Sequence, residues 1–539
     1  MKAQQAKPKI LHLTTEKKLS VLARKLGLKY VQIRPGMIRP EFFEKIPVEL
    51  AAKLGVAPVG LTDNILTIAI SDPLDLELDS KLVDAVSCEI DIVVAEAKQI
   101  TEALRQSESS KKILSNVGQE FAVQVVREGR EGEEQVIDLQ TIQGQSGIVR
   151  LTNSILMAGM EKQVSDIHLE SQEPGLEVKY RIDGVLYPAM DQIDVQHRSE
   201  LISRIKILAD LDIAEQRIPQ DGRFKLRFEN RDVDFRVSVL PTPFGEDVVI
   251  RILDKAAVAR FGTSLTLDDL GLGDKDIEVL RKSAREPYGL VLVTGPTGSG
   301  KTTTLYSMLS ELSTGEEKII TVEDPIEYRL PGIVQVAVNE KKKLTFASGL
   351  RSILRHDPDK IMIGEIRDIN TAEIAIQAAL TGHLVFASVH ANTAFDVISR
   401  FTHWGVDRHD FVTSLNSIVA QRLLRLNCRH CLDDQLIPVA ELEGSGLPIS
   451  KINEANWKYG KGCPSCHGTG YSGRVGVMEH LKISAEMAEL LVRRASLTEL
   501  KQAASTQNMR TIRQAALELA IAGRTTLAEV NRVTFSEQA

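Results

Sequence analysis

Residues 295–302 read Gly295-Pro296-Thr297-Gly298-Ser299-Gly300-Lys301-Thr302. The stretch matches the phosphate-binding loop pattern G-x-x-x-x-G-K-[ST] at every fixed position. An apolar run over 289–294 predicts a buried strand before it, and 302–312 predict a helix after it. Glycines let successive N–H groups turn toward phosphate oxygens, and the helix adds its positive N-terminal dipole. We therefore expect a nucleoside triphosphate site where Lys301 reaches the β- and γ-phosphates, Thr302 binds Mg²⁺ and Thr303 adjoins the ligand.

The composition is that of an ordinary globular protein. At 539 residues the chain is too long for one core, so several domains are expected. The net charge of −7 argues against general nucleic-acid binding. The basic N-terminus lacks the apolar run of a signal peptide, and no window approaches the roughly 20 apolar residues of a membrane span. We expect a cytoplasmic protein that reaches the membrane peripherally, through its partners.

Three segments after the loop place polar residues at the ends of apolar strands, where an α/β sheet binds its ligands. They are residues 319–327, 360–368 and 381–390. In the second, Gly364 stands where many nucleoside triphosphatases carry the Mg²⁺-associated aspartate, so Glu365 is the candidate that orients the attacking water. The first segment would support the metal, and the histidines flanking the third would sense the γ-phosphate or couple subunits. These residues are Glu323, Asp324, His383 and His390.

Each of these side chains also has a plain structural reading. A strand-end acid is often a surface group, and a lone histidine is more often a satisfied structural residue than a ligand. The order of the motifs along the chain is therefore more informative than any one of them.

Four boxes follow one another along the chain: the phosphate loop, Thr321-Val322-Glu323-Asp324-Pro325-Ile326-Glu327, Gly364-Glu365-Ile366-Arg367-Asp368 and Thr381-Gly382-His383-Leu384-Val385-Phe386-Ala387-Ser388-Val389-His390. This combination resembles the secretion ATPase superfamily, specifically the hexameric motors of type II secretion and type IV pilus assembly. The resemblance covers roughly residues 145–535. It implies a multidomain α/β chain in which a RecA-like P-loop ATPase domain follows an α+β (PAS-like) domain and a small N-terminal α/β docking domain.

The expected domain boundaries follow from composition and patterning. Residues 1–105 would form the docking domain, 106–145 a charged linker with at most a transient helix, and 146–260 the second, arginine-bearing motor domain. Residues 261–539 would form the ATPase domain, with a parallel sheet covered by helices on both faces. This last domain includes a zinc-binding insertion at 426–475 and C-terminal helices.

Arginines complete the site that the resemblance implies. The family brings paired arginines of the motor domain to the nucleotide of a neighbouring subunit, and Arg236 and Arg251 match those positions. Arg351 and Arg355 lie four residues apart on one predicted helix face, and the family places such residues near a subunit boundary. Closure would bring their charge onto the polyphosphate and stabilise the transition state. Alone, each could equally be a surface group.

Four of the five cysteines form two C-x-x-C knuckles. Two thiolates from each would surround one tetrahedral Zn²⁺ and leave no open position, which is the pattern of a structural site. A redox pair or unrelated thiols are the alternatives. The predicted ligands are Cys428, Cys431, Cys463 and Cys466, with His430 and His467 as less favoured candidates.

The resemblance implies a homo-hexameric ATPase, with ATP, Mg²⁺ and Zn²⁺ bound, that moves an inner-membrane platform protein during pilus extension or pseudopilus-driven secretion. The N-terminal domain would dock on a membrane-anchored partner. Some relatives bind cyclic di-GMP there through a repeated Arg-Leu-Gly motif, but only Lys25-Leu26-Gly27 approximates it here, so that ligand is not predicted. The rival hypotheses are a nucleic-acid translocase of the same superfamily and a nucleotide-gated scaffold without hydrolysis.

Overall fold

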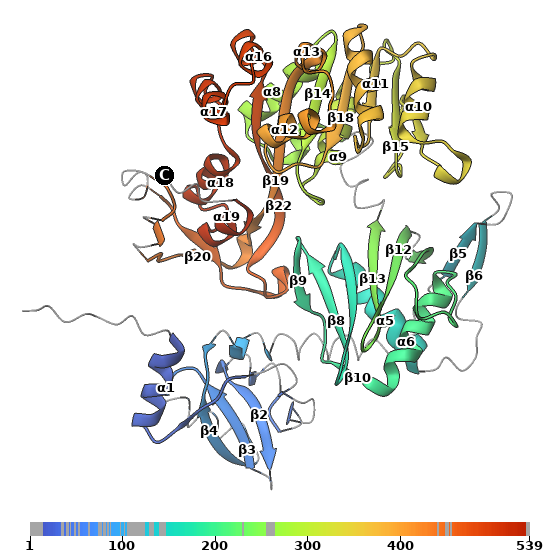
Figure 1. Ribbon diagram of the computed structural model, residues 1–539. Helices are drawn as coiled ribbons and strands as arrows, with labels where there is room; N and C mark the ends of the chain where they lie inside the picture. Colours follow the sequence, from blue (N-terminus) through green and yellow to red (C-terminus); the bar gives the residue numbers. More distant parts are fainter. Residues whose placement is uncertain are drawn as a thin grey trace, which may run out of the picture. The chain divides into compact units, whose positions relative to one another are not determined.

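The computed structural model describes residues 15–104 with short gaps, 124–128, 134–138, and 147–534 apart from 229–230, 255–264 and several positions between 439 and 454. The chain divides into two compact units, Met1–Ala256 and Ala257–Ala539, which are described separately below (Figure 1). Within the described ranges, no helix combines the length and the apolar character needed to cross a bilayer.

The first unit begins with a small four-stranded sheet in the order β1-β4-β3-β2. Its elements are helix α1 (Thr15–Lys25) and strands β1 (Lys29–Tyr30), β2 (Ala57–Thr62), β3 (Ile65–Ile70) and β4 (Glu89–Val94). The alternation over 61–70 predicts one strand, but β2 and β3 pair antiparallel, with Leu61 opposite Leu66. Cys88 is half-buried just before β4. The core gathers apolar residues of these strands, such as Leu66, Ile68 and Val93.

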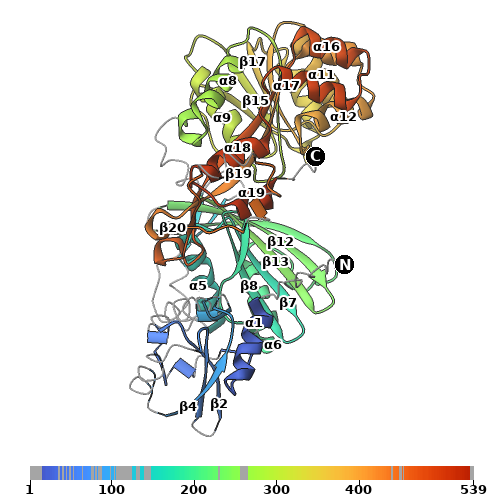
Figure 2. The ribbon, with the colours of Figure 1, turned by 90° about the vertical axis from the view of Figure 1, so that its left-hand side faces the viewer.

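A second, nine-stranded sheet fills the rest of this unit, in the order β10-β8-β7-β13-β12-β11-β5-β6 with β9 also paired to β8. Helices α5 (Gly147–Glu161) and α6 (Val195–Leu208) pack on it and share its core. Figure 2 shows β7, β8, β12 and β13 side by side. The strands are β7 (Asp166–Gln172), β8 (Gly175–Ile182), β9 (Val185–Pro188), β10 (Ile193–Asp194), β11 (Gln220–Phe228), β12 (Arg231–Thr242) and β13 (Gly245–Asp254).

The segment predicted as a linker contributes two strands to this sheet. Strands β5 (Gln124–Glu128) and β6 (Glu134–Asp138) form an antiparallel pair, and β5 hydrogen-bonds to β11. The expectation of at most a transient helix is wrong for these residues. The charge-rich composition suggested a solvated chain, whereas the valines at 125, 126 and 136 lie in strands that extend an existing sheet edge.

The second unit is built on a seven-stranded sheet in the order β16-β15-β17-β18-β14-β19-β22. The pairs are parallel except for the edge strand β22, which runs antiparallel to β19. The strands are β14 (Gly289–Thr294), β15 (Ile319–Glu323), β16 (Val334–Ala337), β17 (Lys360–Ile363), β18 (Leu384–Val389), β19 (Leu415–Asn427) and β22 (Tyr471–Lys482).

Helices cover both faces of this sheet, as the strand–helix alternation predicts (Figure 1). On one face α8 (Asp274–Ala284) and α9 (Lys301–Leu312) pack over Val291 and Val293. On the other, Leu290 and Leu292 belong to a core with residues of α10 (Phe346–Ile353), α11 (Ile369–Leu380), α12 (Ala394–Trp404) and α13 (Arg408–Ser414). Burial on both faces explains why β14 is a continuous apolar run.

The C-terminal segment adds a helical tail to the second unit, as the sequence pattern predicts. Its helices are α16 (Ala485–Val492), α17 (Leu497–Thr506), α18 (Ile512–Ile521) and α19 (Leu527–Val533). The last two pack on β19 and β22 and form a separate core with them. Because the parallel strands end at one edge of the sheet, the segments after β14, β15, β17 and β18 meet there.

Candidate functional site

The phosphate loop links β14 to α9, and its glycines adopt conformations that other residues avoid. Gly298 and Gly300 have φ of +78° and +88°, and Gly295 has φ of +150°. A Cβ on Gly295 would lie 2.5 Å from the carbonyl oxygen of Gln421, and one on Gly300 would lie 2.9 Å from its Nε2. Gly298 has open space around it. Glycine is therefore required at Gly298 and Gly300 by the left-handed backbone, and at Gly295 and Gly300 by the close packing against β19.

Lys301 opens helix α9 and is 8% exposed. Its Nζ donates to the carbonyl oxygens of Gly295 and Pro296, at 2.9 and 3.1 Å. Burial, reinforced by the positive charge of Arg422, lowers its pKa, and Glu365 opposes that shift. A buried ammonium of this kind gains from an approaching anion, because the anion offsets the cost of desolvation. Thr302 and Thr303 follow it in the exposed first turn of α9.

The contribution of β19 is not visible in the motifs. The Thr304 hydroxyl on α9 donates to Oε1 of Gln421 at 2.8 Å, inside the protein. Arg422 next to it donates to the carbonyl oxygen of Asn392 at 3.0 Å. Gln421 and Arg422 lie more than a hundred positions after the loop, and only the strand order β18-β14-β19 brings them beside it.

Glu365, which follows β17, contacts charged and polar side chains from neighbouring segments. Its carboxylate accepts a 2.6 Å hydrogen bond from Nε of Arg367 and lies 3.0 Å from Nε2 of His390. Arg367 also forms an ion pair with Asp324, at 3.7 Å. Burial and the charge of Lys301 lower the pKa of His390, which favours the neutral imidazole. The structure thus brings together Glu365, Asp324 and His390 from three separate segments.

Gly364 and Glu323 are both closely packed where β17 and β15 end. A Cβ on Gly364 would lie 3.2 Å from both the Glu323 Cα and the Val322 carbonyl oxygen, so a larger residue fits only if β15 gives way by a few tenths of an ångström. Glu323 is 2% exposed and points into the interior. It accepts hydrogen bonds from the Tyr306 hydroxyl, from Thr321 Oγ1 at 2.5 Å and from Gln335 Nε2 at 3.1 Å. In this geometry the Glu323 carboxylate ties α9 to β15 through buried hydrogen bonds.

Three predicted residues lie away from the loop within the unit. His383 precedes β18, and its Nδ1 lies 3.0 Å from the Ala378 carbonyl oxygen, at the edge of the sheet where the strands begin. Arg351 is in the last turn of α10, and Arg355 donates back to its carbonyl oxygen at 2.9 Å. Both arginines are exposed, and they precede β17 in the chain.

Arg236 and Arg251 belong to the first unit. They lie directly opposite each other on the antiparallel strands β12 and β13. Arg251 is half-exposed, and its Nε donates to Oδ1 of Asp166 at 2.9 Å. The strand pairing therefore presents both predicted arginines side by side on one face of the second sheet.

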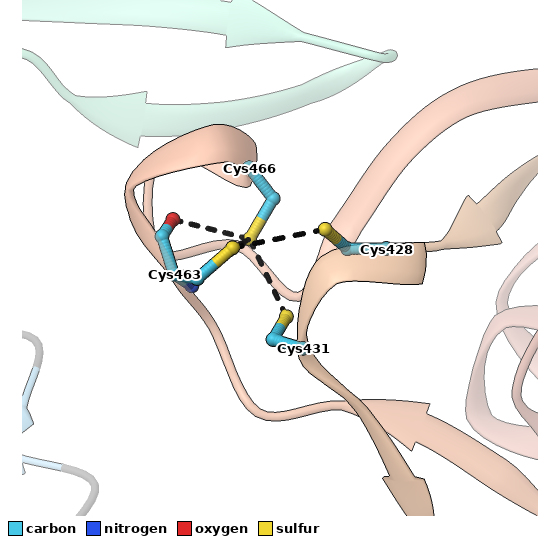
Figure 3. Close-up of side chains that lie close together, drawn as sticks. All are labelled: Cys428, Cys431, Cys463 and Cys466. Atoms are coloured by element: carbon cyan, nitrogen blue, oxygen red, sulfur yellow. Dashed lines mark hydrogen bonds between the residues drawn. The ribbon is translucent and has the colours of Figure 1, made fainter.

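The four knuckle cysteines converge on one point (Figure 3). The sulfurs of Cys428 and Cys463 are 3.8 Å apart, as are those of Cys431 and Cys466, and the Cys463–Cys466 pair is 3.7 Å apart. A tetrahedral Zn²⁺ with Zn–S bonds of about 2.3 Å requires sulfurs about 3.8 Å apart. The donor set and its spacing therefore fit zinc.

Backbone groups support the same geometry. The N–H groups of Gly462 and Gly470 donate to sulfurs of Cys431 and Cys466, each at 3.3 Å. Such bonds stabilise thiolates around a cation. The knuckles are joined by a short antiparallel pair, β20 (Leu432–Asp434) with β21 (Lys458–Gly460). His430 and His467 are not in the four-residue group.

The chain was compared with known proteins. The family model described as Type II/IV secretion system protein matches residues 141–532, and the MshEN domain matches 26–114. The chain belongs to the type II/IV secretion system protein family. The type IV pilus assembly ATPase PilB of Myxococcus xanthus is 39% identical over 516 residues, covering 94% of this chain and 89% of that protein.

The type II secretion system protein E of Pectobacterium carotovorum is 42% identical, covering 80% of this chain and 84% of that protein. The Legionella pneumophila ATPase DotB is 20% identical with a TM-score of 0.51, covering 71% of this chain and 94% of that one, which supports the fold alone.

This secretion ATPase therefore hydrolyses ATP. Its phosphate loop would cradle the nucleotide, and the magnesium ion would neutralise phosphate charge as hydrolysis proceeds. Lys301 lies at the start of α9, directly after the loop, and Glu365 is held by Arg367 and His390 at the end of the adjacent strands. A carboxylate fixed from two sides can orient a water molecule and accept its proton.

Proposed function

We propose that this secretion ATPase assembles as a homo-hexamer whose ATP-driven closure moves an inner-membrane platform protein, powering type IV pilus assembly or pseudopilus-driven secretion. The N-terminal domain docks on a membrane-anchored partner, so the ring works in the cytoplasm, peripheral to the membrane. Supporting this, relatives of similar length are named as a pilus assembly ATPase and as type II secretion proteins.

One observation carries the mechanical part of the proposal. The phosphate loop and Glu365 belong to one compact unit, while the paired Arg236 and Arg251 are presented by the other. A guanidinium beside the γ-phosphate stabilises the charge of the transition state, so hydrolysis is coupled to the approach of a separate rigid body. In a ring, that body comes from the neighbouring subunit.

In this proposal catalysis requires two pairs of residues to come together: Lys301 with Glu365, and Arg236 with Arg251. Lys301 is buried with a lowered pKa, and Glu365 is held beside it by neighbouring side chains. Arg236 and Arg251 add the remaining positive charge when the subunits close. Hydrolysis removes the γ-phosphate that both sides hold, and the interface relaxes.

A mixing experiment tests whether the arginines act between subunits. Lys301→Ala and Arg236→Ala chains should each be almost inactive alone. Co-assembled, they should recover ATPase activity, because some interfaces then combine an intact loop with an intact arginine from another chain. Failure to recover activity would show that both groups act within one chain. Arg217→Ala is the control, because Arg217 is exposed and pairs locally with Glu215.

Two further measurements separate the rival functions. Glu365→Gln should abolish turnover while retaining ATP binding; undiminished turnover would remove Glu365 from the mechanism. The ATPase rate should rise with the cytoplasmic domain of a platform protein and not with DNA. Stimulation by DNA alone would favour a nucleic-acid translocase instead.

A further inference from the structure

A row of charged residues crosses the second sheet at one register position. Arg223 lies opposite Arg236, Arg236 opposite Arg251, Arg251 opposite Asp166, and Asp166 opposite Arg181. The row therefore spans five neighbouring strands, from β11 to β8. Residues directly opposite one another point to the same face of a sheet.

The row lies on the face away from the helices. The strand neighbours Phe235, Ile250 and Ile167 alternate with it and are buried in the core beneath α5 and α6. Like charges directly opposite each other destabilise a sheet, so a carboxylate in the same row offsets part of the repulsion between the arginines. In this row the sole acidic residue is Asp166, at one end of the three arginines.

Asp166 is 5% exposed and is bonded from several sides. Its Oδ1 accepts from Nε of Arg251 at 2.9 Å, and its Oδ2 accepts from the Ser165 hydroxyl at 2.8 Å. Nε of Arg181 lies 3.6 Å from Oδ2. A buried carboxylate with several donors fixes the side chains that bind it.

Arg181 is itself anchored from the other side. It donates to the carbonyl oxygen of Gly184 at 3.2 Å and lies 3.4 Å from Nε2 of His168. Asp166 therefore connects an anchored arginine to Arg251. The carboxylate accepts from Nε of Arg251, and the Arg251 side chain is 52% exposed, so its guanidinium is held by Asp166 and is still reachable from solvent by a phosphate.

We propose that Asp166 is a positioning residue for ATP hydrolysis: it holds the Arg251 guanidinium in the orientation that receives the γ-phosphate of the neighbouring subunit. This inference rests on the proposed role of Arg251. Without the carboxylate, Arg251 is repelled by Arg236 and Arg181 and loses its fixed direction. A misplacement of about 1 Å at a catalytic group can lower the rate roughly a hundredfold.

The test is a double-mutant cycle on the full-length protein. Asp166→Asn should lower the unfolding midpoint, because a buried ion pair is lost, and, assayed well below that midpoint, should lower kcat roughly tenfold or more with a smaller change in KM. The Asp166→Asn/Arg251→Ala double variant should be no slower than Arg251→Ala alone. Asp166→Glu, which keeps the charge, should recover part of the rate.

Asp232→Asn is the matched control, because Asp232 forms a cross-strand pair with Arg227 outside the row. It should leave kcat unchanged. If Arg251→Ala is slow but Asp166→Asn is as fast as the parent, or if the two losses multiply, the positioning role is refuted and the role of Arg251 stands. If Arg251→Ala is itself fully active, Arg251 has no role in hydrolysis, and both its part in the proposed function and this inference are refuted.

Discussion

Replacing Gly300 of the phosphate loop with alanine should lower the free energy of unfolding far more than replacing Gly298. Gly298 and Gly300 both have positive φ, +78° and +88°. An L-residue in the left-handed region costs about 1–2 kcal/mol, so both substitutions carry this penalty. A Cβ at Gly298 meets nothing within 4 Å, whereas one at Gly300 lies 2.9 Å from Nε2 of Gln421.

The difference between the two variants follows from that contact. Gln421 is 3% exposed and must shift to admit the methyl group, which breaks its 2.8 Å hydrogen bond with Thr304. Leaving a buried hydrogen-bonding group unpaired costs about 1–3 kcal/mol. We therefore expect Gly298→Ala to lose about 1–2 kcal/mol and Gly300→Ala about 2–5 kcal/mol of stability.

Thermal unfolding followed by calorimetry, with and without ATP, measures this difference. In a domain of this size each kcal/mol corresponds to about 2–4 °C, so Gly300→Ala should melt at least about 2 °C below Gly298→Ala. Adding Gln421→Ala to each variant should shrink the gap, because the obstructing side chain is gone. Equal midpoints for the two alanine variants would refute the packing of β19 against the loop.

Three other outcomes are expected. Replacing Cys428 and Cys431 with serine should release about one zinc per chain, measured by elemental analysis, and leave ATP binding measurable; retained zinc would refute the ligand set. Glu529→Gln should lower the free energy of unfolding by about 3–5 kcal/mol, because Glu529 is fully buried and forms ion pairs with Arg425 and Arg532. Urea unfolding measures this loss, and an unchanged midpoint would contradict it. Burial and Lys482 lower the pKa of His480 to about 4, so the unfolded chain takes up its proton first as the pH falls. The stability that neutral His480 contributes above pH 6.5 should therefore be lost as the pH falls toward 4. Denaturant midpoints measured across this range should fall less steeply with pH in His480→Asn than in the parent.

Local patterns predicted the elements that carry their own signals. The apolar run before the loop is β14, and Asp183-Gly184 forms the turn between β8 and β9, with φ of +47° and +83°. The C-x-x-C spacing likewise led directly to four converging sulfurs. Each of these depends on residues that are close in sequence.

Features that depend on strand order were not predictable in the same way. Gln421 touches the loop because β19 lies next to β14, and no motif marks that position. His383 and His390 flank one strand, so they lie at opposite edges of the sheet, and only His390 reaches Glu365. Glu323 and Asp324 are adjacent in sequence, yet the first is buried and the second is exposed.

Strand β19 has a mechanical consequence. It contacts the phosphate loop through Gln421 and ends at Asn427, next to the zinc ligand Cys428, so one extended backbone of about 20 Å joins the two sites. Its pairing with β14 ends at Ala420, and from Gln421 to Asn427 it is hydrogen-bonded to β22, with a register irregularity after Arg425. Because β22 begins shortly after the second knuckle, the loop and both pairs of cysteines are connected through one two-stranded antiparallel ribbon, so a shift of the backbone at Gln421 is shared by the two strands that lead to the zinc site.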